Sequence, residues 1–313
     1  FFRSAVYARA VADGHLLGEP LTRLNGRVSA LACTVLHGRS VAAIATVDAS
    51  DNGDGVYVLD LADGQLLGEP LTRLNGRVSA LACTVLDSRP IAVIGTSTRS
   101  MGRVYVLDLA SGQLLGKPLN RLAGSVSALA CTVLDSRPIA VIGTSIESGS
   151  GSGSGLFART KGEVHVWDLA SGQLLDETLP RLEKRVQALA CTVLDGRPIA
   201  VIGTSIGAGV QSRVEVWDLA DGQLLGEALT GFNRLRSLEC TVLDGRPLAV
   251  ITTSAQDLHI WDIRACERVQ RVIVPGVRGA AFSVTGSLVV AMNRDIALLE
   301  RHSDITCGDQ SGT

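Results

Sequence analysis

The sequence lacks long apolar runs, an excess of charge of either sign and a leader peptide. No hydrophobic segment approaches the roughly 20 residues that span a bilayer, so we expect no membrane segment. The formal net charge of −2 over 313 residues gives no electrostatic reason to expect a nucleic acid or an anionic membrane as partner. Residues 1–4, Phe-Phe-Arg-Ser, do not begin a secretory signal. Because no initiator Met precedes them, we interpret the chain as a fragment or a processed product.

The sequence also lacks signatures of catalysis and of metal binding. No Cys-x-x-Cys pair and no Cys/His pair at ligand spacing occurs, which argues against zinc. There is no Gly-x-Ser-x-Gly nucleophile elbow. No histidine recurs with a Ser or Cys partner among His15, His37, His165, His259 and His302. We therefore expect a protein without catalytic residues, cofactor or metal.

One seven-residue motif recurs five times. Ala-Leu-Ala-Cys-Thr-Val-Leu stands at 30–36, 80–86, 128–134 and 188–194, and Ser-Leu-Glu-Cys-Thr-Val-Leu at 237–243. The five cysteines are therefore 50, 48, 60 and 49 residues apart. A period near 50 indicates a repeat architecture, and stacked repeats form one body. We expect a single domain over 1–300 and a disordered tail over 301–313.

Five of the seven cysteines thus share one repeat position, inside an apolar run. We interpret them as small, buried apolar residues. In packed sheets, equivalent positions of neighbouring repeats lie about 10 Å apart, which exceeds the roughly 7 Å between Cα atoms that a disulfide allows. Free thiols indicate a reducing, cytoplasmic compartment.

A single repeat, residues 76–118, predicts four short strands joined by tight turns. Asp87-Ser-Arg-Pro90 and Ser111-Gly112 are turn signals, and no helical periodicity competes with the strands. The expected strands are Val78–Val85, Ile91–Ile94, Val104–Leu107 and Gln113–Pro118. The chain is therefore all-β, built from four-stranded antiparallel sheets. Radial packing into a β-propeller buries both faces of each sheet; a linear stack with polar capping repeats is the alternative.

The third strand of the repeat carries a family resemblance. Residues 164–169 (Val-His-Val-Trp-Asp-Leu), 214–219 and 258–263 resemble the Trp-Asp signature of WD40 repeats. With the recurring Ala-Cys-Thr-Val-Leu-Asp-Gly-Arg-Pro, the chain is similar over about 6–300 to the repeat arrays of large bacterial, especially actinobacterial, WD40 proteins. The resemblance implies a propeller whose innermost strand carries the cysteine and whose outermost strand is Gln-Leu-Leu-Gly-Glu-Pro-Leu.

The chain departs from the WD40 pattern at two positions. Leu59 and Leu107 replace Trp in two repeats, and Asn25-Gly26 or Asn75-Gly76 stands where the family has Gly-His before the innermost strand. The family's buried His-Ser/Thr-Asp-Trp network therefore cannot be completed. We expect apolar packing in its place, with Leu and Cys filling the core.

Counting innermost strands predicts six to seven blades. Such strands begin near 28, 78, 126, 186, 236 and 277, while Val6-Tyr7 and His15–Pro20 match the third and fourth strands of a further repeat. We interpret the chain as derived from a seven-bladed parent whose first strands are missing, with six blades as the alternative. The expected repeats are 1–22 (partial), 23–72, 73–120, 121–180, 181–230, 231–275 and 276–300 (partial).

An Asp follows the third strand in five repeats. Its fixed place favours a side chain that bonds nearby backbone N–H groups in the turn over a ligand-binding ring of carboxylates. These residues are Asp60, Asp108, Asp168, Asp218 and Asp262; a second turn set is Asp87, Asp135, Asp195 and Asp244.

Two irregular features fall on what we call the top face, where by the resemblance the chain enters the innermost strands. The Ser/Gly insertion 147–159 is a flexible loop, either a partner contact or a loop without a role. Arginines gather in the neighbouring loops, and guanidinium groups suit carboxylate contacts. Pairing with Glu19, Glu69 or Glu227 of the outer strands is the alternative. The candidate partner-binding residues are Arg27, Arg77, Arg103, Arg185, Arg213, Arg236, Phe157 and Arg159.

These features favour a non-catalytic scaffold or sensor that binds a protein partner with an acidic surface. The resemblance implies part of a larger bacterial signalling or regulatory protein, with an effector domain in the same parent chain. The alternative is a propeller enzyme of hydrolase or lyase type with a site on the axial top face, because the fold alone does not determine function.

Overall fold

The computed structural model describes most of the chain as short strands. The described residues are 3–6, 21–25, 27–47, 55–72, 74–98, 101–146, 161–175, 179, 184–206, 211–282, 288–292 and 296–299. The Ser/Gly insertion 147–159 and the tail 301–313 lie outside them. No helix within the described ranges has the length and apolar character needed to cross a membrane.

Five four-stranded antiparallel sheets follow one another along the chain, and we number them as blades one to five. Blade one contains β3 (Arg27–Leu36), β4 (Arg39–Val47), β5 (Gly55–Asp60) and β6 (Leu71–Thr72). Blade two contains β7 (Arg77–Leu86), β8 (Arg89–Ser97), β9 (Met101–Asp108) and β10 (Leu114–Ala123). Blade three contains β11 (Ser125–Leu134), β12 (Arg137–Ser145), β13 (Val164–Asp168) and β14 (Gln173–Leu174).

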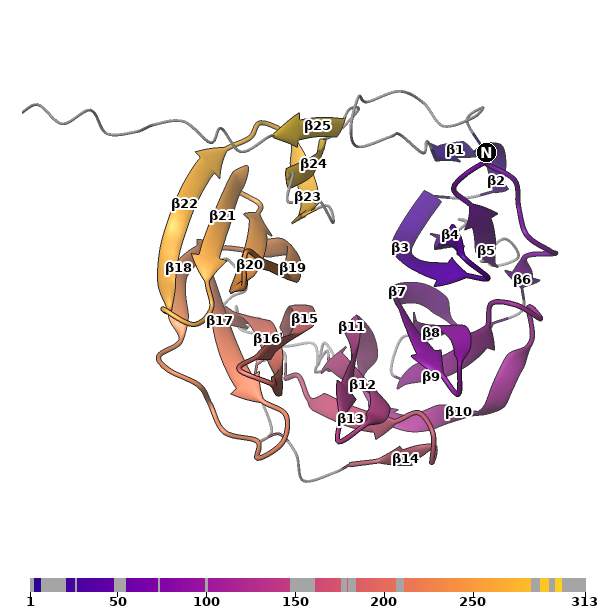
Figure 1. Cartoon of the computed structure of the whole chain (residues 1–313), viewed down its shortest axis with the longest axis horizontal. Coiled ribbons are helices and arrows are strands. Elements are labelled where there is room, and N and C mark those ends of the chain that lie inside the picture. The colour runs from indigo at the N-terminus through magenta and orange to yellow at the C-terminus, as the bar shows by residue number, and fades with distance from the viewer. Residues whose placement is uncertain are drawn as a thin grey trace, which may run out of the picture.

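Blades four and five repeat this order. Blade four contains β15 (Val186–Leu194), β16 (Arg197–Ile206), β17 (Gln211–Asp218) and β18 (Leu229–Asn233). Blade five contains β19 (Leu235–Leu243), β20 (Arg246–Thr253), β21 (Asp257–Asp262) and β22 (Glu267–Ile273). The blades surround a central opening, and the strands that carry the cysteines, β3, β7, β11, β15 and β19, face it (Figure 1). The radial arrangement confirms an all-β propeller over a linear stack.

Smaller sheets lie at the two ends of the described chain. β23 (Val277–Phe282), β24 (Leu288–Met292) and β25 (Ile296–Leu299) form a three-stranded sheet beside blade five, and β1 (Arg3–Val6) pairs with β2 (Leu21–Asn25) near blade one. The predicted count of six to seven blades is therefore wrong, because the described residues complete five. Counting innermost strands treated incomplete terminal sheets as blades. Val6 pairs with Leu21, while the expected fourth strand at 15–20 lies outside the described residues.

Two-residue turns join the first and second strands of every blade. β7 and β8 pair from Arg77 opposite Ser97 to Leu86 opposite Arg89. Between them Asp87 and Ser88 have φ values of 49° and 63°, the left-handed pair that a type I′ hairpin turn requires. The equivalent turns are His37-Gly38, Asp135-Ser136, Asp195-Gly196 and Asp244-Gly245. The predicted turn role of these Asp residues is confirmed.

The second strand of each blade is buried on both faces, which explains its continuous apolar sequence. In β8, Ala92 and Ile94 enter the core between blades one and two, whereas Ile91 and Val93 enter the core between blades two and three. β-Branched residues suit such a strand because they pack against neighbours on both sides.

Glycines in the second strands receive branched side chains from the next blade. A Cβ atom at Gly95 would lie 2.5 Å from Cγ1 of Val126, and one at Gly143 would lie 2.5 Å from Cγ1 of Val186. Gly203 meets Leu235 in the same way. Each of these contacts therefore fits a projection on one blade into a recess on its neighbour.

Candidate functional site

The repeated Asp residues stabilise turns on the bottom face, the face of the two-residue turns. Asp262 accepts hydrogen bonds at Oδ1 from the N–H groups of Arg264 and Ala265, each 3.0 Å long, and Oδ2 accepts from Arg246 at 2.7 Å. The equivalent ion pairs are Arg39–Asp60, Arg89–Asp108, Arg137–Asp168 and Arg197–Asp218. The predicted turn role is confirmed, whereas the Arg partners were not predicted.

In three of these residues the contacts lower the pKa of the carboxyl group. The N–H of Ala62 and the guanidinium of Arg39 hold the pKa of Asp60 below its ordinary value. Burial acts to raise the pKa of Asp168 and of Asp262, but backbone N–H donors and the paired Arg outweigh it, so both pKa values are lowered. Carboxylates held in this way are structural and do not form a ligand-binding ring.

The recurring cysteines are less buried than the sequence predicted. Cys33 is exposed and Cys83, Cys131, Cys191 and Cys240 are half-buried, although the last four pack against the cores between blades. The predicted burial is therefore only partial for these four and wrong for Cys33, because the innermost strand is the edge of each blade and borders the central opening. Burial, with a contribution from Cys33, raises the pKa of Cys83 to about 12. The Cys83 thiol is therefore not an activated nucleophile.

A polar pocket of about 370 Å³ opens on the top face. Blades two to five all contribute, so the pocket lies at the propeller axis. Its lining is Ser79, Ser97, Ser125, Val126, Ser127, Ser145, Arg185, Val186, Gln187, Arg234 and Leu235. We call this set the axial pocket.

β-Bulges aim three of these side chains into the axial pocket. The innermost strands shift register between Val78 and Ala80 and at the equivalent points of β11 and β15, which leaves Ser79, Ser127 and Gln187 as the additional residues. A bulge leaves its extra residue outside the ladder and redirects its side chain. Ser29 and Arg236 hold the same position in β3 and β19. The repeat thereby supplies one polar side chain per blade around the axis.

Hydrogen bonds fix the hydroxyl and amide groups of the pocket. Ser79 Oγ donates to the carbonyl of Val126 at 2.7 Å, and Ser127 Oγ donates to the carbonyl of Gly143 at 3.2 Å. Gln187 accepts at Oε1 from Ser212 Oγ at 2.5 Å. The serine oxygens still offer lone pairs and the Gln187 amide still carries its N–H donors, so the wall presents polar groups of both kinds.

Arg185 and Arg234 supply the charge of the axial pocket. Each directly precedes an innermost strand, and their carbonyls accept hydrogen bonds from Ser205 and Ser254 at 3.0 Å and 2.8 Å. Neither guanidinium forms an ion pair with another described residue. Two such cations beside a polar recess suit a carboxylate from another molecule, because charge-assisted hydrogen bonds are the strong ones.

The structure separates the predicted candidate residues into groups. Arg185 lines the axial pocket, and Arg27, Arg77 and Arg236 are exposed at the top-face ends of β3, β7 and β19. The remaining two described arginines lie in third strands: Arg103 is opposite Thr96 and Arg213 pairs with Glu215 at 2.7 Å. Arg213 thus pairs within its own strand, and not with Glu227, which precedes the outer strand β18. Phe157 and Arg159 lie outside the described residues.

Five half-exposed valines were missed by the sequence reasoning. Each is the penultimate residue of an innermost strand, beside the two-residue turn, so the set borders the axis on the bottom face. They are Val35, Val85, Val133, Val193 and Val242, with exposed fractions of 48–56%. The sequence does contain a signal for these valines, because every repeat carries Thr-Val-Leu directly before its polar turn.

Comparison with known proteins shows the fold alone. No protein-family model matches the chain and no curated protein matches it. Among solved structures, the chain is similar to one described as the structure of the Dos1 propeller, with a TM-score of 0.58 and 15% identity. The similarity covers 91% of this chain and 71% of that one. The chain therefore has a β-propeller fold.

Proposed function

We propose that this protein is a non-catalytic interaction scaffold whose axial pocket binds an acidic segment of a partner protein. The observation that carries the proposal is the placement of Arg185 and Arg234, without ion-pair partners among the described residues, beside a pocket lined with hydroxyl and amide groups. Exposed Arg27 and Arg236 extend the positive charge along the same face. Such a surface attracts carboxylates over several ångströms and holds them by bidentate contacts.

The chemistry of the lining supports binding over catalysis. The described residues that line the axial pocket include no His, Asp, Glu or Cys. General acid–base catalysis needs a titratable group within hydrogen-bond reach of the reacting atoms. Four of the five lining serines donate their hydroxyl hydrogens to backbone carbonyls, an arrangement that holds the wall in place and does not activate an oxygen; they are Ser79, Ser125, Ser127 and Ser145.

The wider proposal places the propeller in a WD40-type array of a bacterial cytoplasmic protein. The Trp-Asp-Leu phrases at 167–169 and 217–219 support that family. In this proposal an effector domain of the same parent chain acts when the propeller engages its partner. Binding to a rigid platform suits such a role, because loops on a fixed scaffold can be varied without changing the fold.

Titration of a fluorescent hexaglutamate peptide tests the proposed site. We expect Arg185→Glu and Arg234→Glu each to weaken binding about tenfold or more, since each charge-assisted contact is worth about 1.5–3 kcal/mol, and we expect affinity to fall as salt rises. Arg268→Glu is the matched control, because it makes the same charge change on the outer strand β22. Equal affinities for all three variants would sink the proposal.

A further inference from the structure

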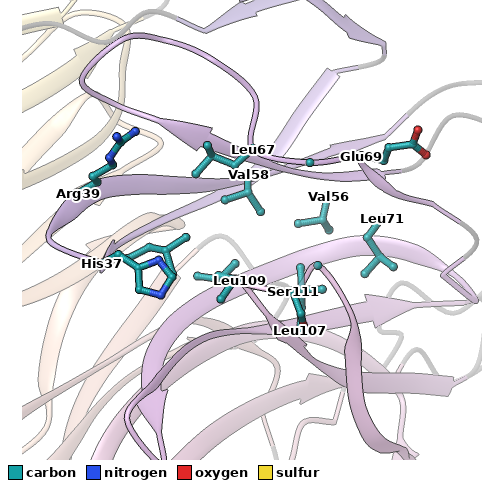
Figure 2. Close-up of a pocket in the computed structure, with 14 residues that line it drawn as sticks. His37, Arg39, Val56, Val58, Leu67, Glu69, Leu71, Leu107, Leu109 and Ser111 are labelled. Atoms are coloured by element: carbon teal, nitrogen blue, oxygen red, sulfur yellow. The ribbon is translucent and has the colours of Figure 1, made fainter.

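A second recess lies between blades one and two, on the bottom face and the outer side of the ring. It is a groove of about 600 Å³ whose floor is aliphatic. In Figure 2 the side chains of the two blades face one another across it, with His37 and Arg39 at one end and Glu69 at the other. The apolar lining is Val56, Val58, Leu67 and Leu71 from blade one and Leu107 and Leu109 from blade two. We call it the interblade groove.

Equivalent positions recur between the other complete blades, and the one between blades four and five is nearly filled. Between blades four and five, Val214 and Val216 face Trp261 around a space of only about 10 Å³. Leu107 and Trp261 are equivalent, since each pairs with an alanine of its second strand, Ala92 or Ala249. Leu107 is buried in the core between the two blades, with 1% of its surface exposed, as the sequence predicted for Leu at this position. The groove nevertheless lies beside it, so the smaller side chain does not close the space that Trp261 closes in blade five.

A second substitution between the repeats enlarges the difference. Cys266 in blade five stands where blade two has Gly112. A Cβ atom at Gly226 would lie 2.9 Å from Sγ of Cys266, whereas one at the equivalent Gly68 would meet nothing within 4 Å. Blade two therefore has an isobutyl group and a hydrogen where blade five has an indole and a thiol. The neighbouring walls are aliphatic in both places.

The size of the groove indicates more than one aromatic ring as its occupant. Its volume falls within the range of about 300–1,000 Å³ in which ligand sites lie. One ring of the kind that fills the position between blades four and five leaves room along the groove for the flanking backbone. A polypeptide segment with one aromatic anchor therefore fits better than an isolated ring.

The charges at the rim of the groove indicate which residue of the bound segment lies beside its aromatic anchor. Glu69 is exposed at one end and forms no ion pair with another described residue. At the other end Arg39 is paired with Asp60 at 3.0 Å, so its charge is compensated. The free charge of the groove is therefore negative, which favours a Lys or Arg next to the aromatic residue.

We infer that the interblade groove binds a partner segment in which an aromatic side chain, best an indole, is followed by a basic residue. The indole occupies the space that Trp261 fills between blades four and five, and the cation reaches Glu69. This site is independent of the axial pocket, because it lies on the opposite face and takes a ligand of opposite charge.

Calorimetric titration with three capped peptides tests the inference: acetyl-Gly-Trp-Arg-amide, acetyl-Gly-Ala-Arg-amide and acetyl-Gly-Trp-Glu-amide. We expect the Trp-Arg peptide to bind at one site, the Ala-Arg peptide at least about tenfold more weakly because the anchor is lost, and the Trp-Glu peptide more weakly than Trp-Arg. Glu69→Gln should weaken Trp-Arg binding about two- to fivefold, as expected for a surface ion pair. Failure of the Trp-Arg peptide to bind at millimolar concentration, or binding equal to that of the Ala-Arg peptide, overturns the inference.

Two substitutions at the equivalent positions locate the site. Leu107→Trp should fill the groove and weaken binding about tenfold or more, while Leu107→Met, which conserves volume, should leave it within about twofold. Trp261→Leu should open the second position and raise the number of bound Trp-Arg peptides from one to two, a gain that holds even if Leu107→Trp fails to fold. Unchanged binding in folded Leu107→Trp refutes the assignment.

Other occupants are separate outcomes of the same experiments. If free indole binds as tightly as the peptide, the groove takes a small aromatic molecule and the polypeptide assignment is lost. If the wild-type protein self-associates in sedimentation and Leu107→Trp is monomeric, the occupant is a second copy of this chain, and the inference is likewise overturned.

Discussion

Arg246 and Asp262 join the second and third strands of blade five through two hydrogen bonds to one oxygen. The Nη2 and Nε atoms of Arg246 lie 2.7 Å and 3.0 Å from Oδ2 of Asp262, while Oδ1 holds the turn that follows. Asp262 is buried and Arg246 is largely exposed. The Asp is therefore the more important partner, because its loss removes the acceptor for both the Arg246 guanidinium and the N–H donors of the turn.

This asymmetry predicts unequal effects of removing the two side chains. Asp262→Ala should lower the free energy of unfolding by about 1–3 kcal/mol, the cost of losing hydrogen bonds to a buried charged group. Arg246→Gln should lower it by only about 0–1 kcal/mol, as for exposed ion pairs. Urea unfolding followed by circular dichroism measures both, and a larger loss for the Arg variant would contradict the assignment.

His259 predicts a pH dependence of stability. It is 4% exposed and packs edge-on against Phe232 with ring centroids 5.1 Å apart. Burial lowers its pKa below 6.5, against the opposing effect of Asp257. Below about pH 6.5 the unfolded chain therefore binds a proton that the folded protein does not, so the free energy of unfolding falls as pH decreases from 6.5 toward the folded pKa.

His259→Tyr should remove that part of the slope, because tyrosine does not titrate there and the equivalent residues in blades one and two are Tyr57 and Tyr105. Exposed His37 provides the control, and His37→Asn should keep the slope. Unfolding free energies measured between pH 5 and 7.5 test the claim, which fails if the Tyr variant retains the wild-type dependence.

The recess at Gly95 predicts a clash that a second substitution relieves. Gly95→Ala places a methyl group 2.5 Å from Cγ1 of Val126, so it should destabilise the protein by about 1–3 kcal/mol, as overpacking does. In the Gly95→Ala/Val126→Ala double variant part of that loss should be recovered relative to the sum of the single changes. Additive losses in a thermal unfolding cycle would show that the two side chains do not compete for space.

The type I′ turns predict a stabilising change. Ser88 and Ser136 both have φ 63°, where blades four and five have Gly196 and Gly245. Because the left-handed region costs a residue with a Cβ about 1–2 kcal/mol, Ser88→Gly should raise the melting temperature despite the added freedom of the unfolded chain. The reverse change, Gly245→Ser, should lower it, and an opposite order of the two variants would exclude backbone strain as the cause.

Strand order and turn positions were predictable because the residues that determine them lie within each repeat. Ile91–Ile94 and Val104–Leu107 lie within the observed strands β8 and β9, since a buried strand needs an apolar run and a hairpin needs residues that tolerate positive φ. The number of complete blades was not predictable in the same way. It depends on long-range pairing, such as that of Val6 with Leu21, which no local pattern encodes.

The candidate site was predicted only in part, for a related reason. Arg185 was identified from its place before an innermost strand, but the bulges that direct Ser79 and Gln187 exist only as a register shift between two strands. The interblade groove was also invisible in the sequence. It results from a difference between two equivalent residues, Leu107 and Trp261. The size of the space beside each of them depends on how the neighbouring blade packs, which the sequence does not show.

The fit of Val126 into the recess at Gly95, and of Val186 into that at Gly143, gives the contact between blades a direction. One side of each such blade donates a projection and the other side accepts one, so the contact is head-to-tail. An additional copy of the repeat inserted between these blades would find a matching surface on both of its sides. The gene can therefore gain or lose whole blades by unequal recombination without a new interface having to evolve. Repeats with nearly identical sequences are the expected result of such a history.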